Sequence, residues 1–83
     1  MKEVYIRVQY FKNAPNNINV MYYKCQCETY GDIFEAIGVL SLAYVEDSTI
    51  VSIYYGYTLP WYVSPKSVVE MPEKFFETKD LKL

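Results

Sequence analysis

The sequence predicts an α+β fold in which a small, mostly antiparallel sheet of four to five strands packs against one helix. Three observations lead to this class. Apolar and β-branched residues alternate with period two in residues 3–11, 18–28 and 49–57. Apolar residues follow a helical period within residues 31–43. Turn-forming residues separate these segments, so the expected order is strand, strand, helix, strand, strand.

The first strand is expected over Glu3–Phe11, where side chains alternate between two faces. One face is the better candidate for the core because it is apolar throughout: Val4, Ile6, Val8 and Tyr10. The next segment, Lys12–Asn17, contains three asparagines and a proline. Asparagine tolerates left-handed backbone and proline cannot donate to a strand ladder, so this segment is expected to be a loop.

The second strand is expected over Ile18–Glu28 and would form a hairpin with the first through the Asn-rich connection. Four of its side chains share one face: Met21, Tyr23, Cys25 and Cys27. The opposite face carries Lys24, Gln26 and Glu28, so that face is expected to contact water.

A helix is expected from about residue 31 to residue 43. Thr29 and Asp32 have the spacing of a capping box, although Glu or Gln fits that motif better than Asp. The apolar residues at helical spacing are Ile33, Phe34, Ile37 and Leu40. Gly38 leaves an alternative open, in which the helix ends early and residues 39–45 form a strand.

The third strand is expected over Thr49–Tyr57, after a turn at residues 46–48. Both of its faces are largely apolar, so this strand is expected to be central in the sheet or covered on both sides. Prolines 60 and 65 bracket Trp61–Val63, which is expected to be a short edge strand or an ordered loop.

The chain is expected to end in a last short strand within Lys66–Met71 and a short C-terminal helix over Pro72–Glu77. Residues 79–83 are expected to be a frayed tail of one domain spanning residues 1–83. The order of elements is similar to that of β-grasp domains, as an analogy of architecture. No family motif accompanies it, and the terminal Gly-Gly of ubiquitin-like members is absent.

Charge and hydropathy argue against several classes of function. The net charge is −2, the pI is near 5.0, and the eight basic residues form no cluster, which disfavours nucleic-acid binding. Apolar runs are too short for a transmembrane helix, and the acidic residue at position 3 does not fit a secretion signal. A cytoplasmic protein with no membrane partner is therefore expected.

The two cysteines, Cys25 and Cys27, are separated by one residue on the same strand face. Alternate residues of a strand lie about 6.5–7 Å apart, at or beyond the upper limit for a disulfide. We expect two reduced, half-buried thiols. A zinc site within one chain would need two further soft ligands, which the sequence does not contain. A metal shared between two chains through the Cys-x-Cys pair stays an alternative, as does a redox role.

The chain has no histidine, which removes the commonest general base and a frequent metal ligand. Its carboxylates fall mostly in turns and on expected helix faces, where a solvated charge is the ordinary situation. A cysteine nucleophile would have no histidine partner, and the chain has no glycine-rich phosphate loop. The protein is therefore expected not to be an enzyme and to use no cofactor and no metal.

Ten of the residues are tyrosine, with four phenylalanines and one tryptophan besides. A core of this size cannot enclose so many aromatic rings, so several of them must reach the surface. Tyr and Trp are enriched at binding hot spots. The expected partner-binding residues are Tyr22, Tyr54, Tyr57, Trp61 and Tyr62.

The favoured function is a small protein-binding module, such as a viral or mobile-element accessory protein that inhibits or adapts a host protein. The first alternative is a homodimer or larger structural homo-oligomer that uses the same aromatic patch as its self-interface. The second is single-stranded nucleic-acid binding by tyrosine stacking, which needs a positive groove that the low pI disfavours. The identity of the partner is not encoded in these patterns.

Overall fold

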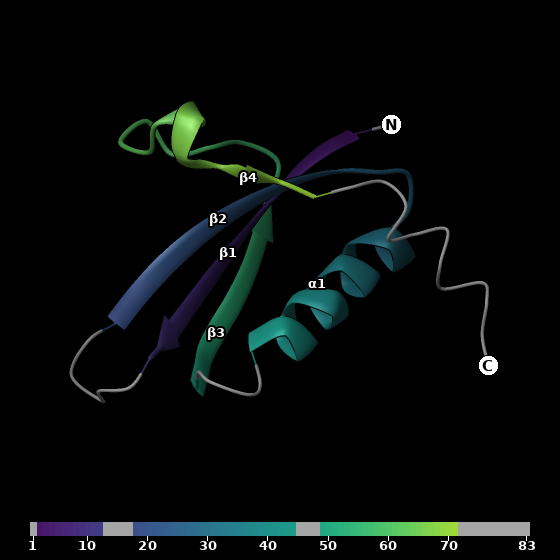
Figure 1. Ribbon diagram of the computed structural model, residues 1–83. Helices are drawn as coiled ribbons and strands as arrows, with labels where there is room; N and C mark the ends of the chain where they lie inside the picture. Colours follow the sequence, from purple (N-terminus) through teal and green to yellow (C-terminus); the bar gives the residue numbers. More distant parts are fainter. Residues whose placement is uncertain (1, 13–17, 45–48, 72–83) are drawn as a thin grey trace.

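The computed structural model describes residues 2–12, 18–44 and 49–71. A four-stranded sheet packs against one helix, and the predicted order of strands and helix is confirmed (Figure 1). The elements are β1 (Lys2–Phe11), β2 (Ile18–Cys27), α1 (Tyr30–Tyr44), β3 (Thr49–Gly56), the short 3₁₀ turn η1 (Pro65–Ser67) and β4 (Val69–Glu70).

The strands lie in the order β3-β1-β2-β4, so β1 is paired on both sides. Strands β2 and β3 both run antiparallel to β1, and β4 adds to β2 in parallel, with Tyr23 opposite Val69. The mostly antiparallel sheet is thus confirmed. One row of the sheet crosses three strands, because Arg7 of β1 lies opposite both Tyr22 and Tyr54.

The expectation that the third strand is central was wrong, because β3 lies at the edge of the sheet. The apolar residues on its two faces lie in different surroundings. Ile53 packs against the core beside Val8, whereas Tyr54 is an exposed aromatic residue on the other face. A β-bulge between the pairs made by Gln9 and Tyr10 interrupts the register of this edge.

The core lies between the sheet and α1, on the face that period-two alternation predicts (Figure 1). Val4, Ile6 and Val8 are completely buried. The other buried apolar residues come from β2, from α1 and from the end of β4: Cys25, Cys27, Ile33, Ala36, Leu40 and Met71. Among the described residues, no charged or polar residue is fully buried, so this is an apolar core with few polar groups to satisfy.

The start of α1 is the predicted capping box, with Asp replacing the usual Glu. The backbone N–H of Asp32 donates to the Thr29 hydroxyl (3.2 Å). The Asp32 carboxylate accepts from the backbone N–H groups of Thr29 (3.2 Å) and Glu28 (2.9 Å). A negative charge here also suits the positive end of the helix dipole.

The helix continues through Gly38 to Tyr44, so the alternative of a strand is wrong for residues 39–44. Contacts with the sheet explain why one glycine does not end it. The Tyr44 hydroxyl hydrogen-bonds the Tyr23 hydroxyl (2.6 Å), and the Tyr44 ring lies 4.6 Å from the Tyr10 ring centre. Packing of the last turn exceeds the cost of glycine, about 1 kcal/mol.

The segment Trp61–Val63 is a turn, which agrees with the ordered loop and not with the short edge strand. The backbone N–H of Val63 donates to the Pro60 carbonyl (3.0 Å), and this closes the turn. The last strand is confirmed as β4 but is shorter than expected. The predicted C-terminal helix at 72–77, the tail at 79–83 and the turn at 46–48 lie outside the described residues.

Replacing Ile6 with alanine should destabilise the fold strongly. Ile6 is 0% exposed in the centre of the core, and such truncations typically cost about 2–5 kcal/mol. The matched control is Ile18→Ala, because Ile18 is 53% exposed at the start of β2 and should lose less than about 1 kcal/mol. Urea denaturation measures both values. Equal losses in the two variants would contradict the core described above.

Candidate functional site

The sheet face opposite α1, called the open face below, carries a groove lined with tyrosines. Helix α1 packs on the other face, and the segment after β3 borders the groove on this one. The groove has a volume of about 370 Å³. The residues that line it come from three strands and from the segment after β3: Tyr5, Arg7, Tyr22, Tyr54, Tyr55, Gly56, Thr58, Pro60 and Tyr62.

Strand register explains where the groove lies. Tyr22 and Tyr54 flank Arg7 on the two neighbouring strands, so they stand on either side of its side chain. Two residues before Arg7 on the same face of β1, Tyr5 lies opposite Gly56, which has no side chain. The absence of a side chain at Gly56 leaves space on the open face beside Tyr5, and this space forms part of the groove.

The segment after β3 forms the remaining wall. The turn closed by Pro60 and Val63 brings Pro60 and Tyr62 to the groove. Trp61 points elsewhere, since it does not line the groove and is 93% exposed. Its ring meets that of Tyr62 edge to face, with 5.7 Å between their centres. Trp61 is therefore an exposed apolar group next to the groove.

The structure brings three of the five predicted binding residues together: Tyr22, Tyr54 and Tyr62. Trp61 is adjacent to them. Tyr57 lies apart, on the helix side of the sheet, where its ring contacts Tyr55 at 6.3 Å between centres. The Nζ of Lys2 lies 4.8 Å from the centre of the Tyr57 ring. Tyr57 and the groove residues therefore belong to different surfaces.

Sequence reasoning did not include Tyr5 and Arg7 among the binding residues. Both stand on the β1 face opposite the core residues, and that alternation was visible in the sequence. What was not visible is that Tyr22 and Tyr54 lie opposite Arg7 on two different strands. The sequence therefore shows which face of β1 carries Tyr5 and Arg7, whereas strand pairing shows which tyrosines lie beside them.

Among the residues that the structure describes, Arg7 is the only charged one that lines the groove. Its guanidinium carbon lies 5.5 Å from the centre of the Tyr54 ring, within the range of a cation–π contact. Its Nη1 donates a hydrogen bond to the Gln9 side-chain oxygen (2.9 Å). The head group is thus held by an aromatic face and a neutral amide.

Beyond one end of the groove lies a small polar network around Glu3. The Glu3 carboxylate is 3.7 Å from the Lys24 ammonium and accepts a hydrogen bond from the Tyr5 hydroxyl (3.1 Å). Partial burial raises the pKa of Tyr5, and the hydrogen bond to Glu3 raises it further. Tyr5 therefore stays a neutral hydroxyl over the physiological range.

A second hollow, of about 340 Å³, lies on the other side of the sheet near the start of α1. Lys2, Cys27, Tyr30 and Tyr57 are among the residues that line it. Burial raises the pKa of Tyr57, and the nearby Tyr30 hydroxyl raises it further. The lining of this hollow therefore combines hydroxyls and a thiol with the charged residues Lys2 and Glu28.

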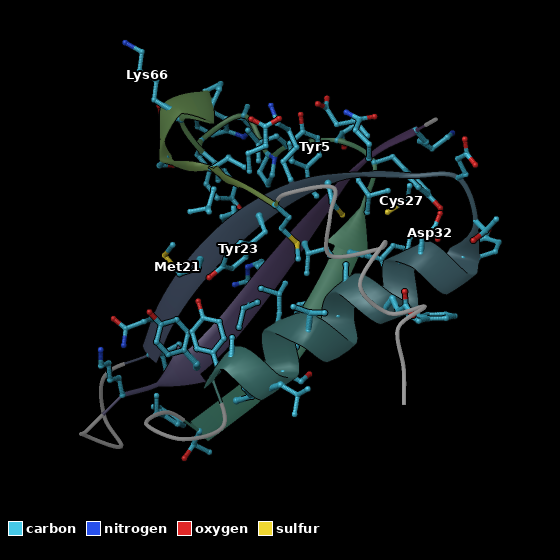
Figure 2. All side chains as sticks on the ribbon, turned by 45° about the vertical axis from the view of Figure 1, so that its right-hand side comes forward. Tyr5, Met21, Tyr23, Cys27, Asp32 and Lys66 are labelled. Atoms are coloured by element: carbon cyan, nitrogen blue, oxygen red, sulfur yellow. The ribbon has the colours of Figure 1, made fainter. Side chains whose placement is uncertain are left out.

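The two cysteines are free and buried, and Figure 2 shows Cys27 between the sheet and the start of α1. Their sulfur atoms are 3.5 Å apart, within reach of a weak thiol hydrogen bond. Burial, followed by this hydrogen bond, raises the pKa of Cys25 to about 12. Burial also raises the pKa of Cys27. Both groups are therefore neutral thiols at physiological pH, not thiolate nucleophiles.

The described part of the chain contains neither a candidate metal site nor a candidate membrane-spanning helix. No group of three or more acidic, cysteine or histidine side chains is placed to hold a metal ion there. Within the same residues, no helix combines the length and the apolar character that crossing a membrane requires.

Comparison with known proteins adds no identification. No family model, curated protein or solved structure matches the chain.

The cysteines should be protected from alkylation in the native protein. At about pH 8 a thiol with a strongly raised pKa is almost entirely protonated, and only the thiolate reacts. Iodoacetamide should therefore modify Cys25 in the native chain at least about a hundredfold more slowly than in the urea-unfolded chain, as mass spectrometry of the cysteine peptide would record. Equal rates would show that the thiols are not buried as described.

Stability should fall in alkaline solution because Cys25 and Tyr44 have raised pKa values in the fold. Burial is the first cause for both groups. The unfolded chain loses these protons first, at about pH 8.5 for cysteine and about pH 10 for tyrosine. Their contribution is complete below those values and is lost as the pH rises towards the folded pKa values. Urea midpoints measured from about pH 7 to pH 11 should decline, and a flat profile would contradict this assignment.

Proposed function

We propose that this protein is a non-enzymatic module that binds a partner protein through the tyrosine groove of its open face. The observation that supports the proposal is the grouping of several tyrosines around a single hollow, among them Tyr5, Tyr22, Tyr54 and Tyr62. Tyr and Arg are enriched among the residues that contribute most to protein–protein binding. Tyr also provides a large contact area with few rotatable bonds, so little entropy is lost when it is ordered.

The size of the groove indicates how a partner would use it. Ligand-binding pockets have volumes of about 300–1,000 Å³, and this groove lies near the lower end. It therefore suits a short segment of a partner protein and not a whole domain. Trp61, exposed beside Tyr62, would extend the contact beyond the groove.

A more specific proposal concerns the biological setting in which the protein binds its partner. An accessory protein of a virus or mobile element, acting on a host protein in the cytoplasm, is consistent with a small chain that binds by contact. This expectation stays a prediction from composition.

A second candidate is self-association, which the edge strand β3 favours. This strand contains no charged residue and no proline, the usual features that keep a free sheet edge from pairing. Among the described residues, it pairs with a strand on one side alone. Sedimentation at micromolar concentration distinguishes the two candidates, since a strict monomer would exclude the self-associating form.

Alanine substitution of Tyr54 or Tyr62 should weaken partner capture by about 2 kcal/mol or more if these rings are central anchors. The tagged full chain would first be used to purify the partner from its host, and affinities would then be measured by calorimetry. The matched control is Tyr30→Ala, because Tyr30 is 63% exposed on α1, similar to Tyr62 at 67%.

Tyr30→Ala should leave the affinity unchanged, and thermal melts should show that all three variants are folded. Folded Tyr54→Ala and Tyr62→Ala variants that bind as tightly as the parent chain would exclude the groove as the interface. Loss of binding in Tyr30→Ala alone would place the interface on the helix side.

A further inference from the structure

We propose that the partner segment held in the groove carries a carboxylate side chain, which the guanidinium of Arg7 binds, between apolar residues that pack on the tyrosines. This inference rests on the proposed function, because it specifies the chemistry of the partner at the same groove. It follows from the position of Arg7, from the charges around it and from the shape of the groove.

The contacts of Arg7 preorganise its guanidinium for binding a ligand. Arg7 lies at the middle of the central strand, between Tyr22 and Tyr54 in the same row. The contact with the Tyr54 ring and the hydrogen bond to Gln9 limit the freedom of its long side chain. Most of its N–H donors remain available, and a planar guanidinium matches the two oxygens of a carboxylate.

The charges on the open face leave Arg7 without a carboxylate. In the described part of the chain, the ion pair on this face joins Glu3 to Lys24 and does not include Arg7. Glu3 is two same-face positions away from Arg7 along β1, about 13 Å. A partly buried cation held among neutral groups attracts an anionic ligand more strongly than a solvated surface charge does. Charge complementarity therefore favours an acidic occupant.

The residues that line the groove indicate which residues should flank the carboxylate in the bound segment. Tyrosine rings and Pro60 offer apolar surface on both sides of Arg7, so residues that flank the carboxylate should be apolar. An extended segment fits best, since aromatic-lined grooves recognise extended peptides without requiring them to fold.

A nucleic acid fits these charges less well. Phosphate backbones are bound by several cations acting together, and the affinity depends on the number of phosphates neutralised. In the described part of the chain, the groove lining holds a single cation, and Lys24 on the same face is already paired with Glu3. An acidic peptide needs only one such cation, so it is the occupant that the observations favour.

The test uses the full chain and an array of capped decapeptides with one central Glu between apolar residues. Each peptide is paired with the same sequence carrying Gln. We expect the best Glu peptides to bind at least about tenfold more tightly than their Gln partners, the effect of one charge-assisted contact. Fluorescence anisotropy would measure the affinities at about 50 mM salt.

Two variants test whether Arg7 is the group that binds the peptide carboxylate. Arg7→Gln should reduce the Glu-to-Gln preference to about one while leaving the tyrosines in place. The matched control, Lys66→Gln, removes the same charge from η1, where Figure 2 shows Lys66 pointing away from the sheet. Lys66→Gln should keep the preference of the parent chain, and thermal melts would confirm that both variants are folded.

Several results would overturn the inference. They are equal binding of Glu and Gln peptides by the parent chain, a preference that survives Arg7→Gln, and tighter binding of a single-stranded oligonucleotide than of any acidic peptide. If both peptide types bind equally and Tyr54→Ala abolishes that binding, the inference fails and the proposed function stands. If no peptide binds, or if peptide binding survives Tyr54→Ala, the groove is not the peptide interface and both fail.

Discussion

Strand β1 is the constraint on which the rest of the structure depends. It pairs with β2 along its whole length and with β3 from Tyr5 onwards, so it connects the two halves of the sheet. Its even-numbered residues, Val4, Ile6 and Val8, fill the core beneath α1. Its odd-numbered residues lie on the open face, where Tyr5 and Arg7 line the groove. A slip of one residue would exchange the two sets, so the core and the groove specify the register of β1 jointly.

The binding properties of the groove depend on residues that folding places beside β1. Arg7 stands between one tyrosine from β2 and another from β3. Stacking on Tyr54 and the hydrogen bond to Gln9 position a charge that no described carboxylate compensates. On the opposite side of the sheet, burial keeps the side chains of Cys25, Cys27 and Tyr44 neutral. The core beneath the helix is thus apolar, whereas the open face carries the cation of Arg7.

Much of this arrangement could be predicted, and the errors have identifiable causes. The capping box at Thr29 and Asp32 marked the start of α1 because such signals involve residues close in sequence. The end of α1 was ambiguous, since Gly38 weakens the local helical preference and the contact between Tyr44 and Tyr23 that secures the last turn joins distant residues. Strand β3 lies at the edge although its sequence predicts a central strand, because two apolar faces are compatible both with a core and with an exposed groove.

The sequence by itself determined the fold class, the order of the elements and the two faces of each strand, because alternation and helical period are properties of consecutive residues. It also determined that tyrosines must reach the surface, since the chain is too short to enclose them all. Only the tertiary structure decided which tyrosines share a surface. Tyr22, Tyr54 and Tyr62 meet around Arg7, whereas Tyr57, one residue beyond β3, lies on the helix side. Strand order and register made that division, and both arise from pairing between segments far apart in the chain.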